Sequence, residues 1–215
     1  MSDYTVLLDQ VRHCRLCADQ LPLGPRPVLQ LHPSARILIA GQAPGRKVHA
    51  SGIPFDDASG ARLRDWLGLD ATQFYDPTLL AILPMGFCYP GSGPHGDLPP
   101  RPECAVHWRV QLLQQLPHLQ LTLVLGQHAL AWHLPAAGTI TQAVRNWQTG
   151  WPHILPLPHP SPRNNLWLQR NPWFANEVLP VLRQRVQHLL GSFLQTDRDN
   201  RIPWGYRSSI FKQIT

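Results

Sequence analysis

The side chains best suited to chemistry lie in a proline-rich stretch at residues 158–165. There, prolines separate His159, Ser161 and Arg163, and two asparagines follow. Each proline fixes its own φ angle and biases the residue before it towards extended backbone. We therefore predict a stiff, non-helical loop that holds an imidazole, a hydroxyl and a guanidinium. An imidazole in fixed geometry can polarise a carbonyl or stabilise a departing anion. The alternative is an ordinary proline-rich connector.

The four cysteines form a second group with chemical potential. Cys14 and Cys17 are separated by two residues, and Cys88 and Cys104 follow much later. A two-residue gap lets both sulfurs point at one metal, and four thiolates suit a [4Fe–4S] cluster or a structural zinc. The alternative is that Cys88 and Cys104 are buried thiols that pack as small apolar residues.

A third group, Phe55-Asp56-Asp57, directly precedes a predicted helix that contains Leu63, Trp66 and Leu67. One aspartate is expected to cap that helix, and the other could orient a water molecule. Phe55 is either a core residue or a stacking surface for a planar ligand. The nearby Gly41-Gln42-Ala43-Pro44-Gly45 is not a phosphate-binding loop, because it lacks the lysine and the glycine spacing of one.

The elements that must position these groups follow from short apolar runs and helical periodicity. Strands are predicted at residues 36–40, 79–83, 121–125 and 154–157, and helices alternate with them, the last at about 172–190. This alternation predicts an α/β fold, a three-layer sandwich with a central four-stranded parallel sheet flanked by helices. Ligands bind beyond the carboxyl ends of such strands, so the loops at Gly41, Cys88, Gly126 and His159 should gather at one edge.

The chain as a whole is expected to form one domain, residues 1–195, with a polar tail at 196–215. Its 215 residues carry a formal net charge of +6, which favours a polyanionic partner. Basic residues near the loops could meet phosphates, although scattered arginines are usually solvated. No apolar run is long enough to cross a membrane, and the first residues do not resemble a signal peptide. We therefore expect a cytoplasmic protein.

Taken together, these motifs resemble the uracil-DNA glycosylase superfamily, especially its iron–sulfur branches, often called families 4 and 5. The resemblance covers about residues 10–190. It rests on Gly41-Gln42-Ala43-Pro44-Gly45, on the segment from Gly52 to Gly60, on Leu123-Val124-Leu125-Gly126, on His159-Pro160-Ser161-Pro162-Arg163-Asn164 and on the order of the four cysteines.

The resemblance implies hydrolysis of the N-glycosidic bond of a deaminated or damaged base, most readily uracil, by a monomer that acts on DNA in base excision repair. The nucleotide would be flipped out of the stack. His159 would stabilise the leaving base and Asp57 would assist water. The implied base-binding residues are Gly41, Gln42, Ala43 and Phe55. The segment that enters the DNA would contain Ser161, Arg163, Asn164 and Leu166, with Leu166 or Arg163 as the wedge. Cys14, Cys17, Cys88 and Cys104 would hold the [4Fe–4S] cluster, ahead of zinc.

Two departures from the family pattern bear on the substrate. Ala43 stands where other branches have a water-activating aspartate, and Pro84-Met85-Gly86 occupies the region of the uracil-reading asparagine. The substrate could therefore extend to hypoxanthine, xanthine or oxidised pyrimidines. The alternative function is a non-catalytic binder of damaged or single-stranded DNA on the same fold. A metal-dependent hydrolase is a distant third, because no histidine and carboxylate cluster has metal-ligand spacing.

Overall fold

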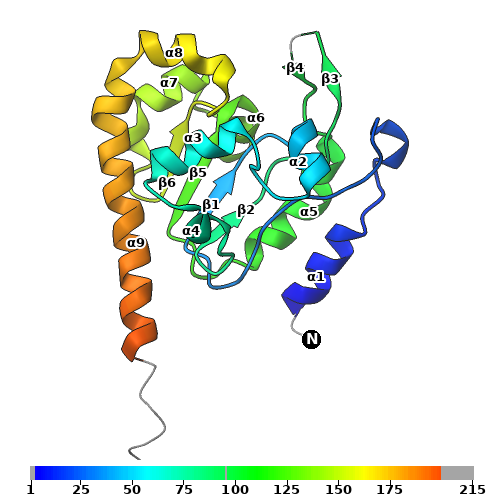
Figure 1. Ribbon diagram of the computed structural model, residues 1–215, viewed down its shortest axis with the longest axis horizontal. Helices are drawn as coiled ribbons and strands as arrows, with labels where there is room; N and C mark the ends of the chain where they lie inside the picture. The colour runs from blue at the N-terminus through cyan, green and yellow to red at the C-terminus, as the bar shows by residue number, and fades with distance from the viewer. Residues whose placement is uncertain (1–2, 95, 200–215) are drawn as a thin grey trace, which may run out of the picture.

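A parallel four-stranded sheet runs through the middle of the molecule, in the strand order β2-β1-β5-β6 (Figure 1). The strands are β1 (Ile37–Ala40), β2 (Leu80–Ile82), β5 (Leu121–Leu125) and β6 (Ile154–Leu157). The computed structural model describes residues 3–94 and 96–199. All four predicted strands are confirmed within one residue at each end.

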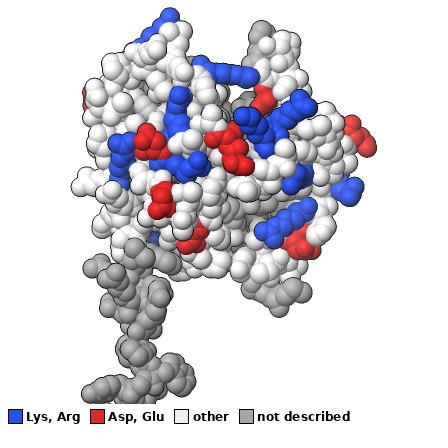
Figure 2. All heavy atoms as spheres, in the orientation of Figure 1, with Lys and Arg blue, Asp and Glu red and all other residues white. Residues whose placement is uncertain are grey.

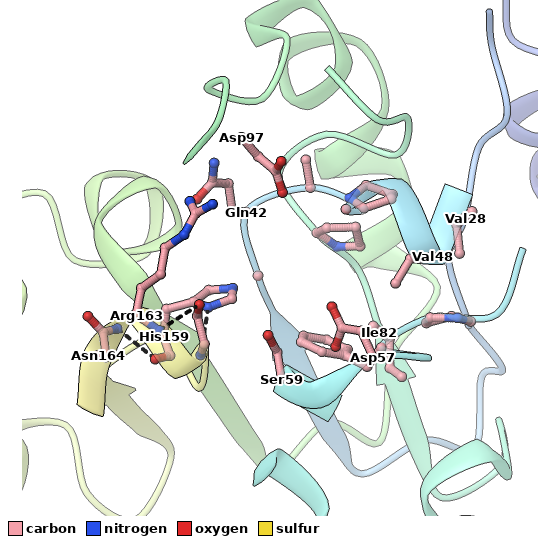
Figure 3. Close-up of a pocket in the computed structure, with 18 residues that line it drawn as sticks. Val28, Gln42, Val48, Asp57, Ser59, Ile82, Asp97, His159, Arg163 and Asn164 are labelled. Carbon is pink, nitrogen blue, oxygen red and sulfur yellow. Dashed lines mark hydrogen bonds between the residues drawn. The ribbon is translucent and has the colours of Figure 1, made fainter. Parts of the chain in front are cut away.

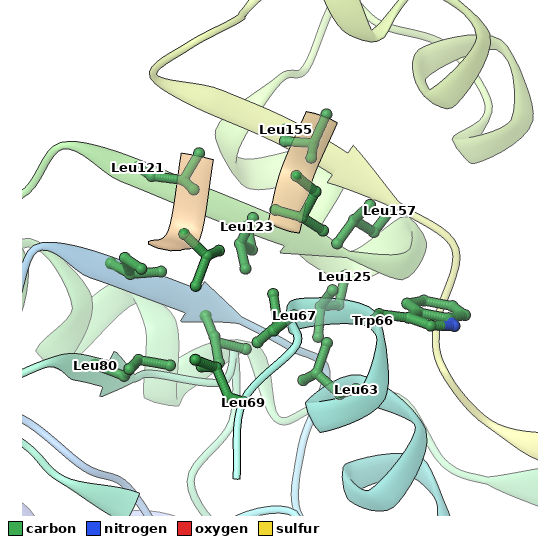
Figure 4. Close-up of a cluster of buried hydrophobic side chains, with 14 of the residues drawn as sticks. Leu63, Trp66, Leu67, Leu69, Leu80, Leu121, Leu123, Leu125, Leu155 and Leu157 are labelled. Carbon is green, nitrogen blue, oxygen red and sulfur yellow. The ribbon is translucent and has the colours of Figure 1, made fainter. Parts of the chain in front are cut away.

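Side chains alternate between the two faces of the sheet, and each face packs against helices. Ile37 and Ile39 join one apolar cluster with α3 (Ala58–Leu67), α4 (Ala71–Tyr75) and α9 (Leu179–Asp199), part of which Figure 4 shows. On the other face, Leu38 packs with α1 (Asp3–Arg12) and α5 (Pro102–Gln114). Ala40 packs with α6 (Gly126–His133) and with α7 (Ile140–Arg145). The three-layer α/β sandwich is confirmed.

The two edges of the sheet explain features that are unusual in a buried strand. Pro156 lies in β6, which pairs with β5 alone, and a proline is tolerated on an edge strand because it need not donate to a further neighbour. The outer edge of β2 is covered by Gln30, whose backbone exchanges two hydrogen bonds with Ile82. Both edges are thereby protected from pairing with another chain.

Several short elements went unpredicted, because a few residues carry little periodicity. They are the helices α2 (Arg46–Ser51), α4, α7 and α8 (Asn165–Arg170), and the helical turns η1 (Ala18–Gln20) and η2 (Trp147–Thr149). Local capping fixes two of them. Asp70 and Gln73 form a capping box on α4, and Thr139 and Gln142 form one on α7.

Two of the loops predicted to follow strands, those at Cys88 and His159, contain regular structure. Residues 89–102 include a two-stranded hairpin, β3 (Ser92–Gly93) with β4 (Gly96–Asp97). The stretch at 158–165, predicted to be non-helical, contains a 3-10 turn, η3 (Pro162–Asn164). The turn forms because Ser161 accepts a hydrogen bond from the Arg163 N–H and because proline suits the first position of a helix.

The last helix also differs from its predicted bounds. A π-helical turn, η4 (Phe174–Val178), leads into α9, which begins at Leu179 and ends at Asp199. The helix thus runs through 196–199, the first residues of the expected tail, and the remainder of that tail lies outside the described residues. Among the residues that the structure describes, no helix has the length and apolar character needed to cross a membrane.

Candidate active site and cysteine cluster

A cavity of about 370 Å³ opens at the carboxyl edge of the sheet, where the segments after β1, β2 and β6 meet (Figure 3). This is the edge at which the sequence predicted a site. The predicted residues that line the cavity are Gly41, Gln42, Ala43, Phe55, Asp57, His159, Ser161, Arg163 and Asn164. The structure therefore brings together residues from three separate motifs.

His159 is fixed by contacts on several sides. The Ser161 N–H donates to its Nδ1 at 3.2 Å, and the Asn164 side chain donates to its carbonyl at 2.7 Å. Gly126, in the left-handed region at φ 77°, abuts the His159 side chain, since a Cβ there would lie 3.5 Å from the His159 Cβ. Arg62 of α3 donates to the Ser161 carbonyl and to the Asn165 side chain. Arg62 could not be predicted as a site residue, because it joins segments far apart in the chain.

The charge state of His159 follows from the same contacts. Burial lowers the pKa of His159 below its ordinary value, and the carboxylates of Asp57 and Asp97 oppose that shift. Because Nδ1 accepts a hydrogen bond, the neutral ring carries its proton on Nε2. His159 is thus a neutral hydrogen-bond donor in the wall of the cavity.

Phe55 is held in an unusual backbone conformation beside the cavity. Its φ is 56°, in the left-handed region that residues with a side chain rarely adopt. Its ring packs edge-on against Phe74, with 6.2 Å between centroids. The turn depends on Gly60, because a Cβ there would overlap the Phe55 carbonyl. Such backbone strain persists only where packing enforces it, and it often marks a functional site.

Asp57 combines the two roles that the sequence divided between neighbouring aspartates. Its Oδ1 accepts the Gly60 N–H at 2.9 Å and caps α3. The residue also lines the cavity. Asp56 is exposed and does not line the cavity, so the capping residue and the candidate catalytic residue are the same aspartate.

The segment after β2 contributes backbone rather than an amide side chain. Pro84 lines the cavity, while the N–H groups of Met85 and Gly86 donate to the carbonyls of Gly41 and Gln42. The Gln42 side-chain nitrogen in turn donates to the Leu98 carbonyl at 3.1 Å. These bonds fix the loop after β1 against the hairpin.

Asp97 is a site residue that sequence reasoning missed. It stands at the end of β4 and lines the cavity, across from Asp57 in Figure 3. Arg163 reaches the same hairpin, because a Cβ on Gly96 would overlap its guanidinium. The available signal was that Asp97 is the one acidic residue in the glycine- and proline-rich segment 89–102, which follows a strand.

Of the residues expected to meet DNA, Ser161, Arg163 and Asn164 line the cavity. Arg163 is exposed and lines it, whereas Leu166 of α8 is 54% exposed and does not. Figure 2 shows Lys and Arg side chains interspersed with Asp and Glu side chains over one face of the molecule. The excess of positive charge is a property of the whole chain, with a formal net charge of +6.

The four cysteines line a second, much smaller cavity of about 20 Å³. The Trp108 indole donates to the Cys14 sulfur and the Phe87 N–H to the Cys104 sulfur, each at 3.3 Å. Burial raises the pKa of the Cys88 thiol to about 11 and that of Cys104 to about 12. Within residues 3–94 and 96–199, no three His, Cys, Asp or Glu side chains are arranged as ligands of one metal ion.

Comparison with known families agrees with the geometry of the larger cavity. A model of the uracil DNA glycosylase superfamily matches residues 30–183. That range includes every predicted residue that lines the cavity, together with Cys88 and Cys104, whereas Cys14 and Cys17 precede it. The match spans more than half of the chain, which therefore belongs to the uracil DNA glycosylase superfamily.

Proposed function

We propose that this protein acts as a monomer and is a DNA glycosylase that removes a deaminated or damaged base, uracil foremost. The observation that carries the proposal is the neutral His159, which lines one cavity with Phe55 and Asp57. Superfamily membership supports the general activity and a DNA partner. Enzymes of this kind must flip the target nucleotide out of the duplex to reach its glycosidic bond.

In the proposed reaction the C1′–N bond breaks and its electron pair moves onto the base. The Nε2–H of His159 would donate a hydrogen bond to the negative charge that develops there. A neutral ring can play this role because its Nε2–H donates a hydrogen bond to the anion without transferring the proton. Phe55 would stack on the base, and Asp57 would face the sugar, which becomes cation-like.

The residues on the rim are proposed to hold the opened DNA. Ser161, Arg163 and Asn164 lie in or beside η3, and Leu166 projects from the first turn of α8. Arg163 offers a charged contact to phosphate, and the exposed Leu166 offers an apolar wedge for the space that the base leaves.

The test is release of free base from DNA that contains uracil, hypoxanthine, xanthine or an oxidised pyrimidine. We expect release of at least one of them, and His159→Ala should lower the single-turnover rate about 10²–10⁴-fold. His118→Ala, which alters an exposed histidine outside the cavity, is the matched control. Folded parent protein that releases no base from any member of this panel would contradict the proposal.

A second candidate function is a non-catalytic binder of damaged or single-stranded DNA. The observation that favours it is that residues 84–86 offer no side-chain amide to the cavity, where a uracil reader is expected. This reading predicts salt-dependent binding that is unchanged in His159→Ala, with no base released by either protein.

We further propose that Cys14, Cys17, Cys88 and Cys104 hold a [4Fe–4S] cluster, with zinc as the alternative. A [4Fe–4S] cluster takes one cysteine sulfur at each of its four irons, and the N–H donors from Trp108 and Phe87 are typical of its surroundings. The four cysteines line one small cavity, so their sulfurs already surround a common space. The bound group would tie the segment after α1 to the start of α5.

Metal analysis of protein purified without oxygen tests this assignment. We expect iron and acid-labile sulfide in the parent protein, and their loss, with a lower thermal midpoint, in Cys17→Ser and Cys104→Ser. Arg15→Ser changes an exposed residue between the first two cysteines and should keep its iron. Bound zinc in place of iron would favour the alternative, and no bound metal would contradict both.

A further inference from the structure

The carboxylates of Asp57 and Asp97 both approach Gly45. An ideal Cβ on Gly45 would lie 3.4 Å from Oδ2 of Asp97 and 4.0 Å from Oδ2 of Asp57. The backbone of Gly45 has φ −77° and ψ 173°, an extended conformation open to any residue. Glycine at this position therefore supplies space rather than backbone freedom. This space, the gap at Gly45, lies within contact distance of two carboxylate oxygens.

Both carboxylates are held in place from behind. Asp57 accepts the Gly60 N–H through Oδ1, which leaves Oδ2 for the cavity. Asp97 accepts the Ser92 hydroxyl through Oδ1 at 3.0 Å, and the Ser92 hydroxyl also bonds to the Tyr89 hydroxyl at 2.7 Å. Tyr89 is buried, so this chain of hydrogen bonds anchors Asp97 to the body of the protein.

The two carboxylates beside this gap also influence His159. Asp57 and Asp97 both act electrostatically on His159 and favour positive charge close to it. A cation-like sugar in the same cavity would be stabilised in the same way. Two carboxylate oxygens accept hydrogen bonds but donate none, so the gap suits a small group with two hydrogens. Water is such a group, and Ala43, after β1, has no carboxyl group with which to bind it.

We propose that Asp97 is a second catalytic carboxylate, which binds the attacking water together with Asp57 in the space that Gly45 leaves. This inference rests on the proposed glycosylase function. As the C1′–N bond breaks, its electron pair goes to the base, and the water oxygen bonds to C1′. One water proton passes to the carboxylate pair and then to solvent, and the departing base takes a proton from solvent.

Single-turnover base release tests the inference in variants that keep the fold. Asp97→Asn should lower the rate about 10²–10⁴-fold. It should bind substrate DNA at least as tightly as the parent, because one negative charge is lost. Asp97→Glu should recover part of the rate, which a purely structural role would not predict. Gly45→Ala should also slow release, since its methyl group fills the gap without strain in the backbone.

The two carboxylates should also behave as a unit. Asp57→Asn keeps an N-cap on α3, because asparagine caps as well as aspartate does. The double variant with Asp97→Asn should therefore be little slower than the slower single variant. Asp56→Asn is the matched control, since Asp56 is an exposed carboxylate that does not line the cavity. Its rate should equal that of the parent.

The results of these experiments distinguish failure of the role proposed for Asp97 from failure of the proposed glycosylase function. Active parent protein with Asp97→Asn at the parent rate overturns the inference alone. A variant that changes the order of preference among bases, with an undiminished rate on one of them, also overturns it, and would instead place Asp97 against an amino group of the base. Parent protein that releases no base overturns the proposed function and this inference with it.

Discussion

At the scale of single residues, some side chains both support the local structure of the site and line its cavity. Asp57 caps α3 with one oxygen and turns the other to the cavity. Asn164 holds the His159 carbonyl through its nitrogen and also lines the cavity. A substitution at either position therefore changes the cavity and also the hydrogen bonds that support it. Asp57→Asn is more informative than Asp57→Ala because asparagine can still cap α3.

A buried pair behind the site also acts at the residue scale. Arg109 is 1% exposed, donates to the carbonyls of Leu83 and Pro84, and lies 2.6 Å from Nε2 of His133. Arg109 thus supports the carboxyl end of β2, next to the cavity. Burial and the neighbouring Arg109 cation together lower the pKa of His133 to about 4.

This pair predicts a loss of stability on acidification. Unfolded His133 binds a proton below about pH 6.5, whereas the folded protein resists protonation until about pH 4. The free energy of unfolding should therefore fall as the pH drops through this window, by about 1–2 kcal/mol between pH 7 and pH 5 from His133. Urea unfolding of parent and His133→Gln measures it. The variant should show the smaller decrease, and equal decreases would contradict the assignment.

At the scale of elements, the site is a meeting of short segments carried by a rigid sheet. Gln42 joins the loop after β1 to Leu98, directly after the β3–β4 hairpin, and Gly96 of the hairpin packs against Arg163 of the turn after β6. Arg62 joins that turn to α3. Figure 3 shows the Arg163 side chain extending from the segment after β6 towards Gln42 and Asp97. Loops held in this way can keep catalytic groups in place while the sheet supplies the stability.

The exposed Leu166 on α8 leads to a prediction about the rates of base release from duplex and from single-stranded DNA. A wedge is needed only where a base leaves a stacked duplex. Leu166→Ala should therefore slow base release from duplex DNA about tenfold or more and leave the single-stranded substrate nearly unaffected, if the wedge offsets a few kcal/mol of unstacking. Rates on the two substrates with the same damaged base measure this. Val106→Ala, an exposed apolar residue on α5, is the control, and equal slowing on both substrates would argue against a wedge.

At the scale of the whole molecule, a net charge of +6 gives a long-range attraction to a polyanion. DNA binding should weaken about tenfold between about 50 and 200 mM salt for every two phosphates contacted. Arg163→Gln should reduce the slope of log Kd against log salt by about one. Arg12→Gln, at the end of α1, should leave the slope unchanged. Titration by fluorescence anisotropy measures both slopes, and a slope that Arg163→Gln does not alter would exclude a phosphate contact.

How much of this protein is readable from its sequence depends on the range of the interaction involved. The four strands are short, continuous apolar runs, and local hydrophobic pattern alone sets their position within a residue. Residues joined to a strand, such as Gly41 and His159, could then be assigned to the carboxyl edge, because parallel strands all end there. Local patterns in the sequence therefore suffice to predict the fold class and most of the residues that line the cavity.

Only the tertiary structure decided which segments distant in the chain contact one another. Three such features leave no local pattern in the sequence: the approach of Asp57 and Asp97 to Gly45, the hydrogen bond from Arg62 to Ser161 and the buried Arg109–His133 pair. The same holds for the protonation of His159, which depends on burial by several loops. A side chain's type is written in the sequence, but its partners and its dielectric surroundings exist only after packing, and these set its chemistry.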